Sequence, residues 1–438
     1  MKFSIFQMLM LAAFGALAVA GIIIFAIGAS GAQSGATVGN VTIWGTLDKS
    51  AFDTALSQII QQDQSLSGVS YVQKNAATFN QSLANAIAEQ KGPDLYVISS
   101  DDAMVNANRV FPIPYTSITQ QQFKDVFVSA ANPFLGAKGV IALPFVVDPL
   151  VLYWNRDLLA GAGIAQPPTL WDQVPAMVQT MTVKDTTGSV QKSGIAFGTY
   201  SNVEDAKAIV SMLVMQAANV GRSVANPITG FDPQGNFISA LNNAYGASSP
   251  PAIDALGFYT EFANPAQTDY SWNGSFTSAR TSFAQGQVAL YVGFASENSL
   301  IGSTNPNLSY SEQFVPQLAH SSRLITFGRA YGFAIPLNSK NPSGALLAAE
   351  KLDTASTTVA FANALGMASA KRLSLSGQTG DQQLVNQAAL AAWNWSDPDP
   401  SATGVIFQAM IDSVGSGAKT LTDAVSLADQ QLLHTIGQ

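Results

Sequence analysis

From residue 40 onward, short apolar runs alternate with longer stretches in which apolar residues recur every three or four positions. The short runs are rich in β-branched and aromatic residues, which is typical of strands, whereas the longer spacing is that of amphipathic helices. Strands that alternate with helices in this way indicate an α/β domain with a largely parallel sheet. The pattern predicts strands at 41–44, 69–72 and 95–98 and helices at 52–60 and 79–87.

The same alternation continues through the rest of the chain. A single hydrophobic core rarely serves about 400 residues, so we expect two α/β lobes. Residues 421–436 carry an apolar stripe, which predicts a final amphipathic helix. Before it, the spacing predicts helices at 170–181, 206–218, 252–262 and 276–284 and strands at 194–197, 288–292 and 331–335.

The N-terminal segment has a different pattern. Residues 3–27 contain no charged residue, and Ser4 and Gln7 are their only clearly polar residues. A helix of this length spans roughly 37 Å, enough to cross a hydrocarbon core of about 30 Å. The apolar stretch of a cleaved signal peptide is shorter, about 7 to 15 residues. The sequence therefore predicts a transmembrane helix or signal anchor within residues 1–30, which attaches the protein to the membrane.

The residues that flank this segment predict its orientation. Lys2 precedes the apolar stretch, and the next positively charged residue is Lys49, so we expect the rest of the chain on the extracytoplasmic side, at the cell surface or in the periplasm. Residues 31–39 are small and polar, which predicts a flexible tether. Small residues at 29–32 leave open the alternative of a protein secreted after signal cleavage.

Composition excludes several functions. Net charge is −8 and no long basic run occurs, which argues against nucleic acid as a partner. The absence of cysteine excludes disulfides, thiolate catalysis, thiolate metal sites and the acylated cysteine of a lipoprotein. The two histidines lie far apart, and no nucleophile-elbow, phosphate-loop or HExxH motif is present, so we expect no metal site and no cofactor.

Acids and aromatic residues are the remaining candidates for chemistry. A glycosidase needs two carboxylates about 5 to 10 Å apart, but spacing along the chain brings no two acids together. Tryptophan and tyrosine rings stack on the apolar faces of sugars, although most tryptophans fill cores. Both interpretations stay open for Trp393 and Trp395. The candidate acids are Asp101 with Asp102, Asp148, Glu297, and Asp397 with Asp399; we interpret the last pair most simply as part of a stiff surface turn.

Several stretches, in the order in which they follow one another, resemble an extracellular solute-binding protein of ABC transporters in the maltose-binding-like group. The stretch IALPFVVDPLVLYWNRDLLAGAGIAQPPTLWDQV at 141–174 is the most specific, because it is similar to the family's Gly-Leu-Pro signature with its following acid and Tyr-Asn-Lys-Asp-Leu. The resemblance covers about residues 40 to 436. The other stretches are VTIWGTLDKS at 41–50, GPDLYVISSDD at 92–102, FAQGQVALYVGFASE at 283–297 and YGFAIPLNSKNPSGALLAAEKL at 331–352.

The resemblance implies a type II periplasmic-binding-protein fold with ligand held between two lobes. Family members often have a tryptophan where this chain has Ser296, and Trp272 is the candidate replacement for that aromatic platform. Second-lobe contacts match poorly, and Tyr200 and Asn202 are the candidates there. The other residues expected at the ligand are Trp44, Asp48, Asp101, Asp148, Ser296 itself, Tyr331, Trp393 and Trp395.

The resemblance also implies lobe boundaries. We expect residues 40–148 and 314–353 in the first lobe and residues 149–313 and 354–438 in the second. Proline fixes φ and lacks a backbone donor, so strand pairing should change at Pro149. Asp148 and Pro149 then form a hinge, and Asp148 is expected at the cleft floor, close to solvent or ligand.

These features predict the substrate-binding component of an ABC importer, which captures a neutral polar solute, a sugar or oligosaccharide, and passes it to permease subunits. Neutrality is expected because charged residues make up only 11% of the chain. Two alternatives remain: a membrane-tethered hydrolase or lyase acting on glycans, and a surface-binding protein without transport that keeps the same fold.

The predicted anchor can be tested by fractionation. Full-length protein should be recovered in the membrane fraction with a mass that includes residues 1–30, because the apolar segment is long enough to span the bilayer. A soluble product that begins near Ala32 would contradict the anchor.

Overall fold

The computed structural model describes residues 37–232, 234, 236–376 and 381–436. The predicted anchor and most of the predicted tether lie outside the described residues. Within the described ranges, no helix is long and apolar enough to cross a membrane.

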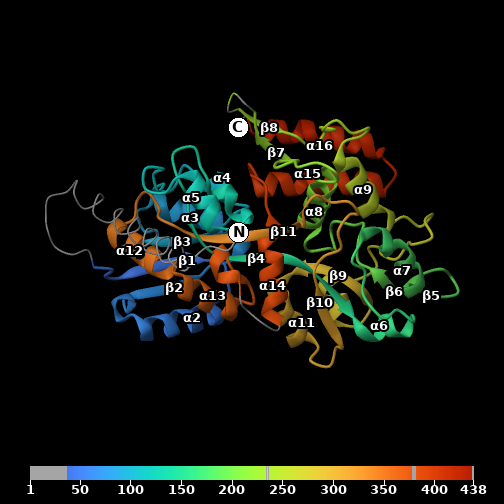
Figure 1. The fold of residues 1–438 in the computed structure, drawn as a ribbon, viewed down its shortest axis with the longest axis horizontal. Helices are drawn as coiled ribbons and strands as arrows, with labels where there is room; N and C mark the ends of the chain where they lie inside the picture. The colour runs from blue at the N-terminus through green and yellow to red at the C-terminus, as the bar shows by residue number, and fades with distance from the viewer. Residues whose placement is uncertain (1–36, 233, 235, 377–380, 437–438) are drawn as a thin grey trace, which may run out of the picture.

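Eleven strands of the described chain form one sheet that passes through both halves of the molecule (Figure 1). In the first half, β1 (Val41–Gly45) lies between β2 (Val69–Gln73) and β3 (Leu95–Ser99) and is parallel to both. Next to β3 runs β11 (Thr326–Ala334), which is antiparallel to it. This order confirms the largely parallel α/β sheet expected there.

The long strand β4 (Leu143–Asn155) connects the halves. Its first part pairs with β11 as far as Pro149, and its second part pairs with β9 (Val288–Phe294) from Leu150 onward. The strand is therefore continuous, but its partners change at the predicted position. The remaining strands are β5 (Val183–Lys184), β6 (Val190–Ile195), β10 (Tyr310–Gln313), β12 (Ala368–Ser369), β13 (Ala392–Trp393) and, in a separate hairpin, β7 (Thr229–Phe231) and β8 (Phe237–Ser239).

Helices cover the sheet in both halves (Figure 1). The first half carries α2 (Lys49–Gln62), α3 (Phe79–Ala88), α4 (Ala103–Asn106), α5 (Gln120–Val126), α12 (Pro342–Leu352) and α13 (Ala355–Leu365). The second carries α6 (Arg156–Gly161), α7 (Val174–Met181), α8 (Ala206–Ala218), α9 (Pro251–Glu261), α10 (Ala279–Ala284), α11 (Asn298–Thr304), α15 (Pro400–Gly415) and α16 (Leu421–Ile436). Between the halves, α14 (Asp381–Leu390) packs on β4 and β12.

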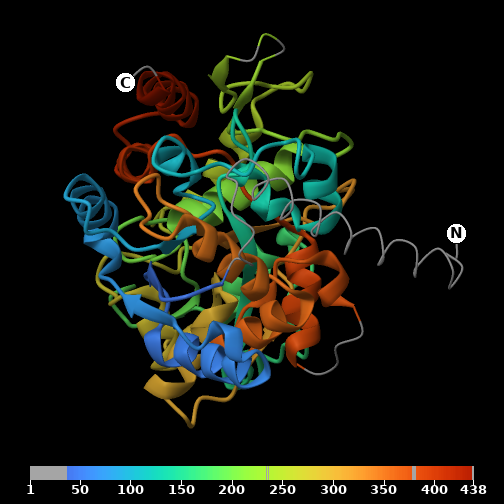
Figure 2. The same cartoon turned by 90° about the vertical axis from the view of Figure 1, so that its left-hand side faces the viewer.

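An aromatic cluster holds the first lobe together. The Phe361 ring on α13 is fully buried, 4.7 Å from the Phe52 ring on α2 and 5.2 Å from the Phe145 ring on β4. Helices α2 and α13 pack against each other on the side that faces the viewer in Figure 2. The larger apolar cluster continues from β3 and β4 into the second lobe.

The observed packing differs from the expected lobe boundaries in two places. Helix α13 was expected in the second lobe, but Phe361 places it in the core of the first. Residues 314–325 were expected in the first lobe, but Gln317 exchanges backbone hydrogen bonds with Thr169 and Trp171 of the second. Both differences have one cause: the chain crosses between the lobes at β11 and again after β12, where sequence spacing carries no signal.

Truncating Phe361 should destabilise the first lobe. Phe361→Ala removes a buried ring from the aromatic cluster and should lower the free energy of unfolding by about 3–5 kcal/mol. Leu373→Ala is the matched control, because Leu373 is 90% exposed and its truncation should change stability by less than about 0.5 kcal/mol. Similar unfolding curves for both variants would show that the cluster contributes little.

Candidate functional site

A cavity of about 220 Å³ lies where the two lobes meet. One wall comes from the first lobe just after β3, and another from the start of α8 in the second lobe. The floor comes from β11, and the segment after β13 closes the remaining side. The lining residues are Asp101, Tyr200, Glu204, Asp205, Lys207, Ala208, Ser211, Phe327, Arg329, Asn394, Trp395, Asp397 and Pro400.

Asp101 is held at the first-lobe wall by two partners. Its carboxylate accepts one hydrogen bond from Arg329 Nε at 2.7 Å and another from Asn394 Nδ2 at 2.7 Å. Burial alone would raise the pKa of Asp101, but the Arg329 guanidinium and the Asn394 bond outweigh burial and lower the pKa. Asp101 is therefore ionised at neutral pH, and its orientation is fixed before any ligand arrives.

Asn394 links the lobes at this wall. Its side-chain amide also donates to Ser100 Oγ at 2.8 Å, and Ser100 in turn accepts from the backbone N–H of Ala330 on β11 at 3.0 Å. The amide group thus connects the segment after β13 to the end of β3.

The opposite wall contains a second ion pair. The ammonium of Lys207 on α8 contacts the carboxylate of Asp397 and donates to Thr403 Oγ1 at 2.6 Å. Burial raises the pKa of Asp397 to about 6, and Lys207 limits that rise. The expected surface turn at 397–400 is therefore wrong for Asp397, which is only 2% exposed and pairs with Lys207. Asp399 caps the N-terminus of α15.

Trp395 supplies an aromatic wall. Its indole Nε1 donates to Ser211 Oγ at 3.1 Å, and its ring stacks on Phe407 with centroids 6.0 Å apart. The Lys207 ammonium lies 5.3 Å from the Trp395 centroid. The ring is only 3% exposed, so it forms part of the cavity wall and does not project into solvent.

Asp148 lies outside this cavity and is buried. It is 3% exposed, and its carboxyl oxygens accept from the backbone N–H of Ser296 at 3.1 Å and from its hydroxyl at 2.6 Å. Burial raises the pKa of Asp148 to about 7. The expectation of contact with solvent or ligand is wrong in this conformation, because β11 and Ser296 cover the carboxyl group.

The second-lobe candidates divide into one cavity residue and two structural residues. Tyr200 lines the cavity. Trp272 is fully buried, stacks on Phe276 at 4.5 Å and donates to Thr199 at 3.0 Å, so it forms no aromatic platform. Asn202 donates to the backbone carbonyl of Asn273 at 3.0 Å and holds the loop that carries Trp272.

Four further candidates lie outside the cavity lining. The exposed side chain of Asp48 caps α2 by accepting from the Ala51 N–H at 2.8 Å. The ring of Trp44 is covered by the Lys74 ammonium at 3.6 Å, and the ring of Trp393 by the Arg323 guanidinium at 3.9 Å. The half-buried Tyr331 on β11 lies opposite Ser99 on the neighbouring strand β3.

Sequence reasoning missed Arg329, Lys207 and Asn394 as cavity residues. Arg329 carried a usable signal, because it is the single charged residue in the apolar strand TFGRAYGFA. Lys207 and Asn394 carried none, because their partners lie 190 and more positions away in the chain.

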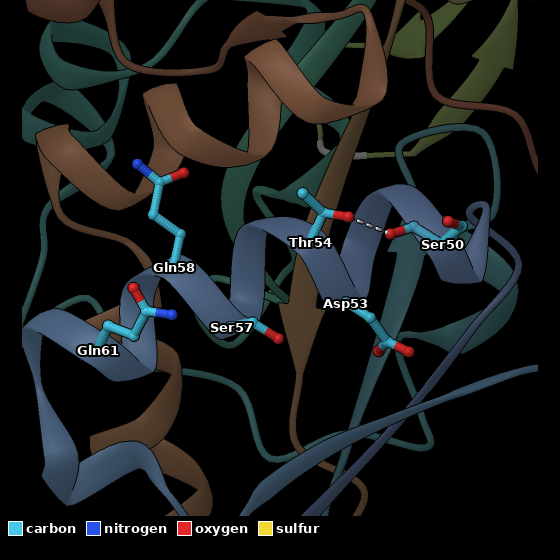
Figure 3. Close-up of a pocket in the computed structure, with 6 residues that line it drawn as sticks. All are labelled: Ser50, Asp53, Thr54, Ser57, Gln58 and Gln61. Atoms are coloured by element: carbon cyan, nitrogen blue, oxygen red, sulfur yellow. Dashed lines mark hydrogen bonds between the residues drawn. The ribbon is translucent and has the colours of Figure 1, made fainter.

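A second depression lies along α2, far from these ion pairs in the sequence. Figure 3 shows that its lining side chains project from successive turns of this one helix. It is therefore a polar helix surface without a facing wall. The lining residues are Ser50, Asp53, Thr54, Ser57, Gln58 and Gln61. In the described part of the chain, no group of three or more His, Asp or Glu side chains is placed to hold a metal ion.

The chain matches a known protein family over most of its length. The bacterial extracellular solute-binding protein family matches residues 68–358, which are 291 of the 438 residues. The chain belongs to this family. As its description says, this is a family of extracellular binding proteins. No curated protein matches the chain in sequence.

Solved structures share the fold of this solute-binding protein. An ABC-transporter solute-binding protein from Thermotoga lettingae, bound with α-D-tagatose, has a TM-score of 0.69 at 19% identity. The match covers 91% of this chain and 100% of that protein. A cyclo/maltodextrin-binding protein complexed with maltotetraose has a TM-score of 0.70 at 14% identity, with 92% and 99% covered. A substrate-binding protein from Listeria monocytogenes, in complex with cycloalternan, has a TM-score of 0.67 at 15% identity. The match covers 91% of this chain and 99% of that protein. These likenesses confirm the mixed α/β, two-lobed solute-binding fold.

The buried carboxyl at the lobe junction should make stability depend on pH. In the unfolded chain Asp148 titrates near 3.8, whereas burial raises the folded pKa to about 7. Its contribution to stability is therefore complete below pH 3.8 and is lost as pH rises through about 7. The amide side chain of the Asp148→Asn variant cannot ionise, so the Tm of this variant should gain a few degrees relative to the wild type between pH 5 and pH 8. Differential scanning calorimetry measures this, and a Tm difference that does not change with pH would contradict it.

Proposed function

We propose that this solute-binding protein captures a sugar between its lobes and delivers it to the permease of an ABC importer. The main support for this proposal is the cavity of about 220 Å³, which is lined by residues of both lobes. It combines an aromatic ring, Trp395, with polar side chains that are already oriented by ion pairs, as at Asp101. Aromatic faces suit the C–H faces of a sugar, and fixed carboxylates suit its hydroxyl groups.

The cavity size favours a small ligand. Pockets for larger organic ligands measure about 300–1,000 Å³, so a cavity of about 220 Å³ suits one or two sugar rings in this conformation. The related structures named above contain ligands from tagatose to maltotetraose and cycloalternan, which supports a carbohydrate as the class of solute.

Capture proceeds by hinge closure. The lobes share β4 and β11, and β4 changes partners between Pro149 and Leu150. Small rotations at this junction move Asp101 of the first lobe relative to Lys207 and Trp395 of the second. A ligand that touches both walls binds the closed arrangement better than an open one and therefore shifts the population toward it.

Two of the four acids that line the cavity are held in ion pairs and suit binding better than catalysis. Asp101 is engaged by Arg329 and Asn394, and Asp397 by Lys207 and Thr403. Neither carboxyl is free to exchange protons with a glycosidic bond without breaking an ion pair. We therefore propose a non-enzymatic role, with the lobes outside the cytoplasm and residues 3–27 as the membrane anchor.

Intrinsic fluorescence tests capture. Titrating the full-length protein with mono- and disaccharides should give a saturable change in tryptophan emission for at least one sugar, because Trp395 lines the cavity. Trp395→Phe keeps an apolar ring but loses the bond to Ser211, and should weaken calorimetric affinity by about tenfold, or roughly 1.4 kcal/mol.

Trp154→Phe is the matched control, because Trp154 lies on β4 outside the cavity lining and should leave affinity unchanged. Absence of saturable binding across the sugar panel would contradict sugar capture. Release of cleaved product from any glycan would contradict the non-enzymatic role.

A further inference from the structure

Charged residue types are more frequent in the lining of the proposed sugar site than in the chain as a whole. Only 11% of the chain is charged, yet six of the thirteen residues that line the cavity carry a charge. Four of these six are acids and two are bases. They are Asp101, Glu204, Asp205, Asp397, Lys207 and Arg329.

Two of the four acids are neutralised inside the cavity wall. Arg329 pairs with Asp101 at 2.7 Å, and Lys207 pairs with Asp397. Both bases of the cavity are used in these pairs, so neither is free to receive an anionic ligand. Glu204 and Asp205 form no ion pair within the lining, although Arg329 also interacts electrostatically with Asp205.

The surroundings of Glu204 and Asp205 leave acidic groups in excess. Arg280 interacts electrostatically with both, but its guanidinium contacts the carboxylate of Glu297 at 3.4 Å. Glu297 is a third, buried acid, and it lies close enough to Asp205 for a side-chain hydrogen bond. These three carboxyl groups outnumber the two guanidinium groups that act on them, Arg280 and, at Asp205, Arg329. Burial and the charge of Glu297 raise the pKa of Asp205, as expected where acids are crowded together.

The start of α8 offsets only part of this charge. Asp205 precedes Ala206, the first residue of that helix, and makes no side-chain capping bond to it. A helix N-terminus supplies the equivalent of about half a positive charge, which is less than one carboxylate. The Asp205 carboxyl shares a side-chain hydrogen bond with Glu297, and one of its oxygens is buried.

The same cavity offers surfaces for a sugar ring beside these acids. Trp395 and Tyr200 line it together with Glu204 and Asp205. The Lys207 ammonium already lies 5.3 Å from the Trp395 ring, so the aromatic wall tolerates positive charge nearby.

We propose that the cleft selects a small sugar bearing a protonated amino group, with the ammonium placed against Asp205 and Glu204. This inference rests on the proposed sugar capture and narrows its class of ligand. The low overall charge of the chain favours a neutral solute, whereas the local excess of carboxyl groups favours a cationic one. Charge-assisted hydrogen bonds from the ammonium to the carboxyl groups of Glu204 and Asp205 would balance the excess acid.

Isothermal titration calorimetry on the full-length protein at pH 6.5 and fixed ionic strength tests the inference. Each of glucose, galactose and mannose is compared with its 2-amino-2-deoxy counterpart, and glucuronate provides an anionic ring of the same size. In at least one pair the amino sugar should bind about tenfold or more tightly, and glucuronate should bind more weakly than glucose.

The variants Asp205→Asn and Glu204→Gln should each reduce the affinity ratio between the amino sugar and its neutral partner by about fivefold or more. Asp53→Asn on the exposed face of α2 removes an acid outside the cavity and should leave the ratio unchanged. Glu204 is exposed, so its variant keeps the test valid if Asp205→Asn fails to fold.

Two outcomes separate the inference from the proposed function. Neutral hexoses that bind as tightly as every amino counterpart, or variants that leave the ratio unchanged, would overturn amine selection and leave sugar capture standing. Absence of binding to any sugar in the panel would overturn both.

Discussion

Strand β4 runs through both lobes, and its hydrogen-bond partners change from β11 to β9 between Pro149 and Leu150. Proline donates no backbone hydrogen bond, so this is the position where a strand can exchange partners with little cost. Asp148, directly before it, closes the junction by accepting two hydrogen bonds from Ser296 of the second lobe. In the proposed hinge closure, rotation at this junction changes the distance between the wall that carries Asp101 and the wall that carries Lys207.

Ion pairs orient the polar groups around that cavity before a ligand enters. Arg329 holds Asp101, and Lys207 holds Asp397, each pair being partly shielded from water. Groups that are fixed in advance lose little conformational freedom on binding, which favours affinity. The carboxyl groups of Glu204 and Asp205 form no ion pair within the lining, although Arg329 also acts electrostatically on Asp205. In the proposed amine selection, these two groups distinguish one solute from another.

Much of the fold could be predicted from the sequence, because apolar spacing and strand length are local properties. The alternation of strands and helices and the change of pairing at Pro149 follow from residues that are close in the chain. The lobe boundaries at 314 and 354 could not be predicted in the same way. Helix α13 is placed by contacts of Phe361 with Phe52, more than 300 positions away, and spacing holds no information on such contacts.

The site was predictable in part for the same reason. Asp101 follows a strand and Tyr200 follows another, and both line the cavity. Trp272 and Asp148 had the right residue types, but both are buried and lie outside the cavity lining. Their environment is set by Thr199 and Ser296, which the sequence does not connect to them.

A crystal structure of the protein with the sugar that binds most tightly tests the central claim most directly. The account predicts a sugar ring between the lobes, in contact with Asp101 and Trp395, with any amino group within hydrogen-bond distance of Asp205 or Glu204. A sugar bound on one lobe alone, away from Asp101 and Trp395, would contradict it.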